Sequence, residues 1–265
     1  MTGKNRISCT AGVSESIGFL LIFTIVIAGI GMVTLYGYPM LLQQQTSADE
    51  QIMEKNIIVL QNDVKSLAYK AVPYKETSLK IGGGTLAVFG SGYTPATSSI
   101  KIYNSTTIYV DSFHSGDLMY SSASAGTDIS LQNGAVVKRP HAEPGSVMLA
   151  EPRWFHDSQT NTMVINLVNI TSTDILSRTG VGTVQMALGE TQFRIESLPA
   201  GDIVTLEYTP DPTQDYSIAW DNYFQKTQGM TLVSGTPGTG SILTYNLPPT
   251  NTLVIKQYEV IIRSL

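Results

Sequence analysis

The clearest feature of the hydropathy pattern is one long apolar run near the start of the chain. Residues 16–48 contain no Asp, Glu, Lys or Arg, and the densest apolar part is 17–42. About 20 apolar residues are enough to cross the hydrocarbon of a bilayer as a helix, whereas the core of a secretory signal has only about 7–15. The run therefore predicts one membrane-spanning helix.

The charges on either side of this run predict its orientation. Lys4 and Arg6 precede it, whereas Asp49 and Glu50 follow it. Basic residues are retained on the cytoplasmic side of a membrane, so the N-terminus is expected inside and the long C-terminal part outside. Tyr36 falls near the outer end, where aromatic residues gather at the membrane interface.

Beyond the apolar run the pattern becomes amphipathic. Pro39 is expected to kink the helix or end its first segment, because proline removes a helical hydrogen bond. Apolar positions then recur in steps of four and three, which predicts a helix with one buried face that ends before Pro73. The alternative is a coiled-coil dimer stalk, but the stripe covers fewer than three heptads, and Ile58 and Ala68 widen it. The stripe consists of Met53, Ile57, Leu60, Val64, Leu67 and Ala71.

After Pro73 the pattern is typical of β-structure. Short runs rich in Val, Ile, Thr and Tyr alternate with Gly, Asn, Asp and Pro, which favours many short strands joined by turns. The expected fold class is therefore α+β, with a long N-terminal helix followed by an all-β, sandwich-like head. The expected strands are 77–81, 85–89, 99–103, 107–112, 146–150, 163–170, 182–188, 192–195, 202–208, 217–220, 231–233, 241–245 and 253–262.

Three segments between these strands carry predictions of their own. Turns are expected at Gly82-Gly83-Gly84 and Asn133-Gly134. The polar stretch 121–144 has a weak pattern and is expected to form a long exposed loop. An amphipathic helix is suggested only at 220–226.

Composition narrows the classes of function. Only 14% of residues are charged, and the net charge is −5 with a pI near 5.2. This charge argues against nucleic acid as a partner, because there is no basic excess to replace phosphate counterions. Cys9 is the one cysteine and precedes the apolar run, so the β head has no disulfide and no thiolate metal site.

The residues just before the apolar run resemble the N-terminus of archaeal type IV pilins. Members of that family carry a small residue, then Val-Ser-Pro-x-Ile-Gly and a β-branched apolar stretch dotted with glycine. Glu15 stands where proline is common, which is a departure. The resemblance covers about the first 45 residues, and the matching positions are Gly12, Val13, Ser14, Ile17 and Gly18.

The resemblance implies that a prepilin peptidase cuts between Gly12 and Val13 and leaves the apolar helix on the mature protein. Cys9 would then belong to the discarded leader. The implied organisation is a leader at 1–12, a hydrophobic and amphipathic stalk helix at 13–72, and an extracellular β-rich head at 73–265.

Within the expected helix, two features bear on assembly. Glu15 lies in the first turn, where an acid stabilises the helix dipole; it also resembles the near-N-terminal Glu of bacterial type IV pilins. Thr24, Ala28 and Gly31 recur at helical spacing and form a stripe of small residues that permits close helix–helix approach. The alternative is that small residues are simply frequent in membrane spans.

Two sequons, at Asn104 and Asn169, are candidate N-glycosylation sites if the head is extracellular. Asn104 falls between two expected strands and is the better candidate.

Other motifs give no catalytic set, and no cofactor or metal site is expected. The glycine-rich segment 235–241 lacks the lysine of a phosphate-binding loop and favours a hairpin loop. The histidines His114, His141 and His156 have no metal-ligand spacing, and Asp211 and Asp215 favour a turn over a calcium loop. Trp154, Trp220, Tyr216 and Tyr223 form either an adhesive surface or, as large aromatics more often do, the core.

The sequence therefore predicts a non-enzymatic cell-surface filament subunit, a pilin or pseudopilin, with its length favouring a minor subunit. Its expected partners are the membrane, prepilin peptidase, and copies of itself or related pilins through the N-terminal helix. The expected location is the cell membrane with the head outside, or an extracellular filament. The alternative is an uncleaved, single-pass, membrane-anchored extracellular binding module.

Overall fold

The computed structural model describes residues 11–92, 98–199 and 201–265. The chain divides into two compact units, Met1–Ala48 and Asp49–Leu265. The described part of the first unit is helical. It contains α1 (Ala11–Met32), the π-helical turn η1 (Val33–Gly37) and the start of α2 (Tyr38–Lys70).

The irregularity expected at Pro39 takes the form of this π-helical turn. The backbone N–H of Tyr38 donates to the carbonyl of Val33, one residue farther back than in an α-helix. A proline ring clashes with the carbonyl four residues earlier, which here is Leu35 inside the widened turn. The turn therefore makes room for the ring, and the helix continues as α2 instead of ending.

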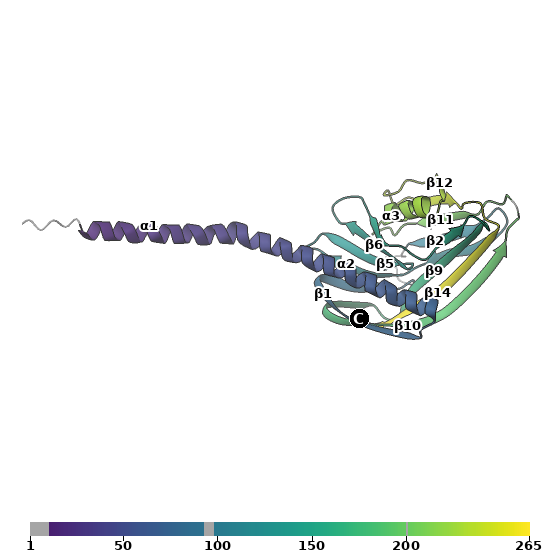
Figure 1. Ribbon diagram of the computed structural model, residues 1–265, viewed down its shortest axis with the longest axis horizontal. Helices are drawn as coiled ribbons and strands as arrows, with labels where there is room; N and C mark the ends of the chain where they lie inside the picture. The colour runs from purple at the N-terminus through teal and green to yellow at the C-terminus, as the bar shows by residue number, and fades with distance from the viewer. Residues whose placement is uncertain (1–10, 93–97, 200) are drawn as a thin grey trace, which may run out of the picture. The chain divides into compact units, whose positions relative to one another are not determined.

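The second unit, called the head unit from here on, has three layers (Figure 1). From Asp49 onwards α2 covers one face of a nine-stranded sheet, and a five-stranded sheet packs against the other face. The expected α+β class, with a long apolar helix followed by a mostly β head, is confirmed.

The nine-stranded sheet has the order β7-β6-β5-β4-β1-β10-β14-β9-β8, and the five-stranded sheet has the order β12-β13-β11-β2-β3. Among the described strands only β14 and β9 pair in parallel, and the other pairs are antiparallel. The strands are β1 (Tyr74–Phe89), β2 (Ser99–Tyr103), β3 (Ile108–His114), β4 (Asp117–Ser122), β5 (Thr127–Gln132), β6 (Ala135–Pro140), β7 (Val147–Ala150), β8 (Phe155–Asp157), β9 (Thr162–Ser172), β10 (Leu176–Ser197), β11 (Thr205–Thr209), β12 (Thr231–Ser234), β13 (Leu243–Asn246) and β14 (Thr252–Ser264).

The amphipathic stripe of α2 packs on the nine-stranded sheet. Ala71 is the exception, because the helix has ended at Lys70 and Ala71 is exposed in a left-handed conformation. The stripe therefore packs within the head unit and does not form a coiled coil. Its buried members, each at most 1% exposed, are Met53, Ile57, Leu60, Val64 and Leu67.

The glycine run at 82–84 does not form the expected turn. It is a bulge inside the single strand β1, whose pairing with β10 shifts register between Ile81 and Leu86. A side chain at Gly84 would overlap the carbonyl of Ser121, so the close approach of β4 requires glycine there. In the same way, the predicted strands 182–188 and 192–195 are both parts of β10.

The expected loop at 121–144 is wrong, because this stretch contains the end of β4, all of β5 and β6, and the Asn133-Gly134 turn that joins them. Alternate residues of β5 face α2 and the five-stranded sheet, and both faces are buried. The face opposite α2 is polar, so the sequence lacks the continuous apolar run that is typical of a strand buried on both faces. Its residues are Asp128, Ser130 and Gln132, each at most 4% exposed.

The expected strand at 217–220 is also wrong. Residues Ser217–Asn222 form the helix α3, which continues into the π-helical turn η2 (Tyr223–Thr227). Ser217, Ala219, Trp220, Tyr223 and Phe224 are buried, and this spacing of three and four is helical. The suggested amphipathic helix at 220–226 overlaps α3 and η2.

Candidate functional site

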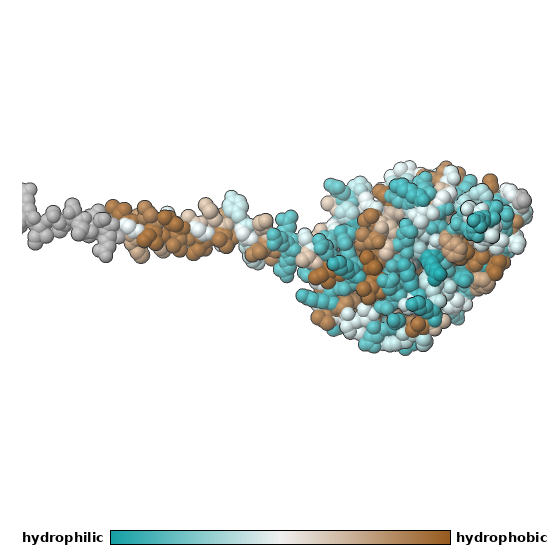
Figure 2. All heavy atoms as spheres, viewed as in Figure 1, coloured by the Kyte–Doolittle hydropathy of each residue, from teal (hydrophilic) through white to brown (hydrophobic). Residues whose placement is uncertain are grey.

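The apolar helix α1 buries no face within its own unit. All residues between Ile17 and Met32 are exposed except Gly31, which is partly exposed, and apart from Thr24 they are all apolar or glycine, as the face drawn in Figure 2 shows in brown. A helix that is apolar all round requires a lipid or protein environment. With 22 residues α1 is about 33 Å long, so the segment is long and apolar enough to cross a bilayer.

The few polar groups of this segment suit an environment without water. Thr24 Oγ1 donates to the carbonyl of Leu20 at 2.8 Å, and Thr34 Oγ1 donates to that of Ile30 at 2.9 Å. Both hydroxyls are thus satisfied inside the helix, as membrane burial demands.

The predicted stripe of Thr24, Ala28 and Gly31 lies on one face of α1 by its spacing. A Cβ built on Gly31 would meet nothing within 4 Å, so this face is open to a partner. The predicted cut between Gly12 and Val13 and the role of Glu15 stay predictions: residues 1–10, including Cys9, lie outside the described part, as do the side chains of residues 11–15.

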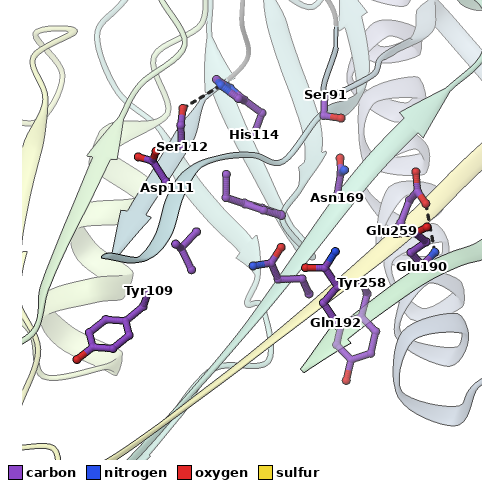
Figure 3. Close-up of a pocket in the computed structure, with 13 residues that line it drawn as sticks. Ser91, Tyr109, Asp111, Ser112, His114, Asn169, Glu190, Gln192, Tyr258 and Glu259 are labelled. Carbon is purple, nitrogen blue, oxygen red and sulfur yellow. Dashed lines mark hydrogen bonds between the residues drawn. The ribbon is translucent and has the colours of Figure 1, made fainter. Parts of the chain in front are cut away.

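In the head unit, a polar groove lies between the edge strand β3 and strands β9, β10 and β14 of the nine-stranded sheet (Figure 3). Its volume is 610 Å³. Asp111, Glu190 and Glu259 supply three carboxylates, of which Asp111 forms an ion pair with Lys101 at 3.6 Å, and the described lining residues include no Lys or Arg. Its other residues include Tyr109, Val110, Phe113, His114, Asn169, Gln192 and Gln257. The groove is therefore negatively charged with an apolar floor on the β3 side.

Two β-bulges shape this groove. In β3 the extra residue falls at Asp111-Ser112, where Ser112 has a φ of 49° and its hydroxyl contacts His114 Nε2 at 3.2 Å. In β10 the extra residue falls at Gly189-Glu190, opposite β14. Bulges re-aim groups at functional sites, and the bulge in β10 brings the backbone N–H of Glu190 to the carboxylate of Glu259.

The carboxylate of Glu259 is fixed in place. Its Oε1 accepts from Thr171 Oγ1 at 3.2 Å, and its Oε2 accepts from the backbone N–H of Glu190 at 3.2 Å. A Cβ at Gly189 would overlap this carboxylate, so glycine is needed for the close approach. The groove thus presents a positioned anionic group rather than a mobile one.

The opposite face of the same strands is apolar and basic; we call it the basic face. Beside the C-terminal part of α2, two adjoining hollows of 430 and 420 Å³ are lined, among the described residues, by four cationic residues and no acidic one. Phe155, Phe193 and Ile195 are 49%, 60% and 56% exposed there. The cationic residues are Lys65, Lys70, Arg153 and Lys256.

The two sequons have different environments. Asn104 lies on the turn between β2 and β3, where its Nδ2 donates to Tyr109 Oη at 2.7 Å and to Asp202 Oδ2 at 2.6 Å. Its Oδ1 accepts from the backbone N–H of Thr107 at 2.6 Å. Asn169 lies inside β9, paired with Glu259 of β14, and its Oδ1 is buried without a hydrogen-bond partner in the described structure.

A buried acid lies between the two sheets. Asp117 is 6% exposed, and its Oδ1 accepts from Ser130 Oγ at 2.5 Å. The pKa of Asp117 is raised to about 8, chiefly by burial and also by the nearby Asp211 and Asp128, against the opposing effect of the Ser130 hydrogen bond. Asp128 itself contacts His141 Nε2 at 2.7 Å.

The remaining candidates are structural. The aromatic residues form the core between the sheets, with the Trp154 and Phe224 rings stacked at 5.6 Å. Asp211 closes a turn through the N–H groups of Thr213 and Gln214, and segment 235–241 joins the paired strands β12 and β13. The three histidines contact different groups: His114 contacts Ser112, His141 contacts Asp128, and His156 Nε2 contacts the carbonyl of Pro249 at 3.1 Å.

Comparison with known protein families matches residues 12–263 to a family of unknown function, DUF7289. The match includes the apolar helix and nearly all of the head unit. No curated protein matches the chain, and no solved structure matches it.

Proposed function

The chain belongs to DUF7289, a family of unknown function, and we propose that it is a cell-surface filament subunit of the archaeal type IV pilin kind. The observation that carries the proposal is the apolar run of α1 from Ile17 to Met32, whose large apolar side chains are exposed, continuous in sequence with an α2 whose far half is built into a β-rich head unit. The pilin-like residues Val13, Ser14, Ile17 and Gly18 support the same conclusion.

In this function α1 first holds the protein in the membrane, with Lys4 and Arg6 inside and the head unit outside. A prepilin peptidase removes residues 1–12 and leaves the helix on the mature chain. The helices of neighbouring subunits then pack together, with Thr24, Ala28 and Gly31 allowing close approach. The head is displayed for adhesion or surface contact, and no chemistry is required of it.

The test is the intact mass of the protein purified from native membranes and from sheared surface fibres. A chain that starts at Val13 and is found in the fibre fraction is the expected result. Gly12→Val is expected to block the cut, because a branched side chain replaces the small residue before it, whereas Gly3→Val in the same leader serves as the matched control. A mass retaining Met1 or Thr2, found only in membranes, would refute the proposal and leave an uncleaved anchored module.

The sequons give a second prediction. A glycan is expected on Asn104, which lies on a partly exposed turn, and not on Asn169, which is half-buried in a paired strand. Attachment at Asn104 replaces at least one of the two hydrogen bonds of its Nδ2. Glycopeptide mass spectrometry of the native protein checks this, and sugar on the Asn169 peptide alone would contradict it.

A further inference from the structure

The polar groove and the basic face lie back to back on β10 and β14. Two neighbouring residue pairs between β10 and β14 contribute to the two surfaces. These pairs are Gln192 with Gln257 and Phe193 with Lys256. Gln192 and Gln257 line the groove, whereas Phe193 and Lys256 line the basic face, because side chains alternate across a strand.

The two surfaces are complementary in charge. The groove holds the carboxylates of Glu190 and Glu259, together with that of Asp111, which forms an ion pair with Lys101, and among the described residues the basic face is lined by four cationic groups and no carboxylate. Within the basic face, burial and the nearby Arg153 guanidinium lower the pKa of Lys65, an effect that Glu151 only partly opposes. Cationic groups crowded in this way are stabilised by an anionic partner.

The surfaces are also complementary in their apolar parts. Phe193 is 60% exposed, and Lys256 Nζ lies 5.3 Å from the centre of its ring, so the two side chains form one projecting aromatic and cationic group. The groove offers the partly buried Phe113 to the ring, and the carboxylates of Glu190 and Glu259 to the ammonium. Exposed aromatics beside cations are typical of the centre of an interface.

Within the head unit, the basic face lies far along α2 from the residue at which the chain enters that unit. It adjoins Tyr69 and Lys70 at the C-terminal end of α2, whereas the chain enters the head unit at Asp49. These two points on the helix are about 30 Å apart.

We propose that the basic face of one head docks into the polar groove of a second copy of this chain. Because the two surfaces differ and lie on opposite sides of one sheet, the contact is heterologous, and each added copy presents a free groove or a free basic face to the next. The contact deepens the proposed function, on which it rests, by naming the head surfaces that hold neighbouring subunits.

Cysteine crosslinking in the full chain tests the contact. In a Cys9→Ser background, a chain with both Glu190→Cys and Lys256→Cys, expressed in its native cells and treated with a short bismaleimide, is expected to give a ladder of dimers, trimers and longer products. Either cysteine alone is expected to give none. Glu190→Cys with Lys80→Cys, an exposed site elsewhere, is the matched control without a ladder.

Charge reversal provides a second measurement. In the chains used for charge reversal, the cysteines are placed two residues from the reversed positions, at Gln192→Cys and Val254→Cys. Lys256→Glu or Glu190→Lys alone is expected to abolish the ladder in these chains, and the two together are expected to restore it. Unchanged tryptophan emission shows that the variants are folded.

The outcomes separate this contact from the proposed function. A cleaved chain in fibres without a ladder overturns the contact and leaves the filament function intact. A ladder from an uncleaved chain in membranes supports the contact while the filament function fails. Dimers formed by the Lys256→Cys chain alone would assign the basic face to a symmetric dimer and overturn the proposal. Labelling of the Lys256→Cys chain by a lipid-borne maleimide, without a ladder, would assign the basic face to lipid and also overturn it.

Discussion

Replacing Asp117 with asparagine is expected to remove a large part of the pH dependence of the head unit's stability between pH 4 and pH 8. The carboxyl group is buried between the sheets, and its pKa in the folded state is about 8. In the unfolded chain the pKa of an aspartate is about 3.9. The folded state therefore binds a proton that the unfolded state has released.

The sign follows from this difference. Stability from a group whose folded pKa is raised is fully present below the unfolded pKa and is lost as pH rises through the folded pKa. The free energy of unfolding of the parent chain should thus fall, by on the order of 5 kcal/mol, from pH 4 to pH 8 on account of Asp117. The neighbouring residues Asp128 and Asp211 are the same in both chains, so the comparison isolates residue 117.

Asparagine stays neutral and retains an oxygen that accepts from Ser130. At pH 8 the variant should therefore be several kcal/mol more stable than the parent, and near pH 4 the two should agree. Denaturant unfolding in detergent, followed by the emission of the buried Trp154 and Trp220, measures this. Asp111→Asn, at an acid whose side chain is 71% exposed, is the control. Parallel pH curves for the parent and Asp117→Asn would show that Asp117 is ionised when folded.

Replacing Leu60 with alanine is expected to lower the free energy of unfolding by about 2–5 kcal/mol. Leu60 is fully buried between α2 and the nine-stranded sheet, so its removal leaves a cavity in the layer that joins the helix to the strands. The next residue along the chain, Gln61, adds a polar anchor, because its Nε2 donates to the carbonyls of Gly134 at 2.7 Å and Glu151 at 3.0 Å.

Val59→Ala is the matched control, since Val59 lies on the same helix and is 47% exposed. Substitutions at such surface positions usually stay within about 0.5 kcal/mol. The same denaturant titration compares the two variants. A loss in Val59→Ala equal to that in Leu60→Ala would mean that helix propensity, rather than packing on the sheet, determines the effect.

The helical part of the fold was predictable because its signals are local. An uncharged apolar run and a stripe spaced by three and four residues predict a helix whatever its surroundings. Burial of Met53, Ile57 and Leu60 follows from that spacing alone. Strands with one apolar and one polar face, such as β2, were predictable for the same reason.

The errors arise where tertiary contacts override local pattern. In β5, Asp128 and Ser130 are buried and polar because they face other polar groups between the sheets, which no local pattern reveals. Three consecutive glycines predict a turn at 82–84 because glycine adopts turn conformations readily. In the structure they form a bulge in β1 instead, where β4 approaches closely. The three residues of β8 are too few to show any period.

The groove and the basic face were not predictable from the sequence. Glu190 and Glu259 lie 69 positions apart and meet only because β10 and β14 are neighbours. The doublet Gly189-Glu190 is compatible with a bulge, but nothing local indicates that its acid is aimed toward β3. The assembly stripe and the leader cut rest on sequence alone and stay predictions.

The position of β14 has a consequence for synthesis of the chain. This strand is the last of the nine in chain order, yet it lies inside the sheet between β10 and β9 and pairs with both along most of its length. Until it has emerged, β9 and β10 each keep one edge without a partner, and the sheet remains in two pieces. The head unit therefore cannot complete its fold until β14 has been made, and this late step pairs strands that are far apart in the sequence.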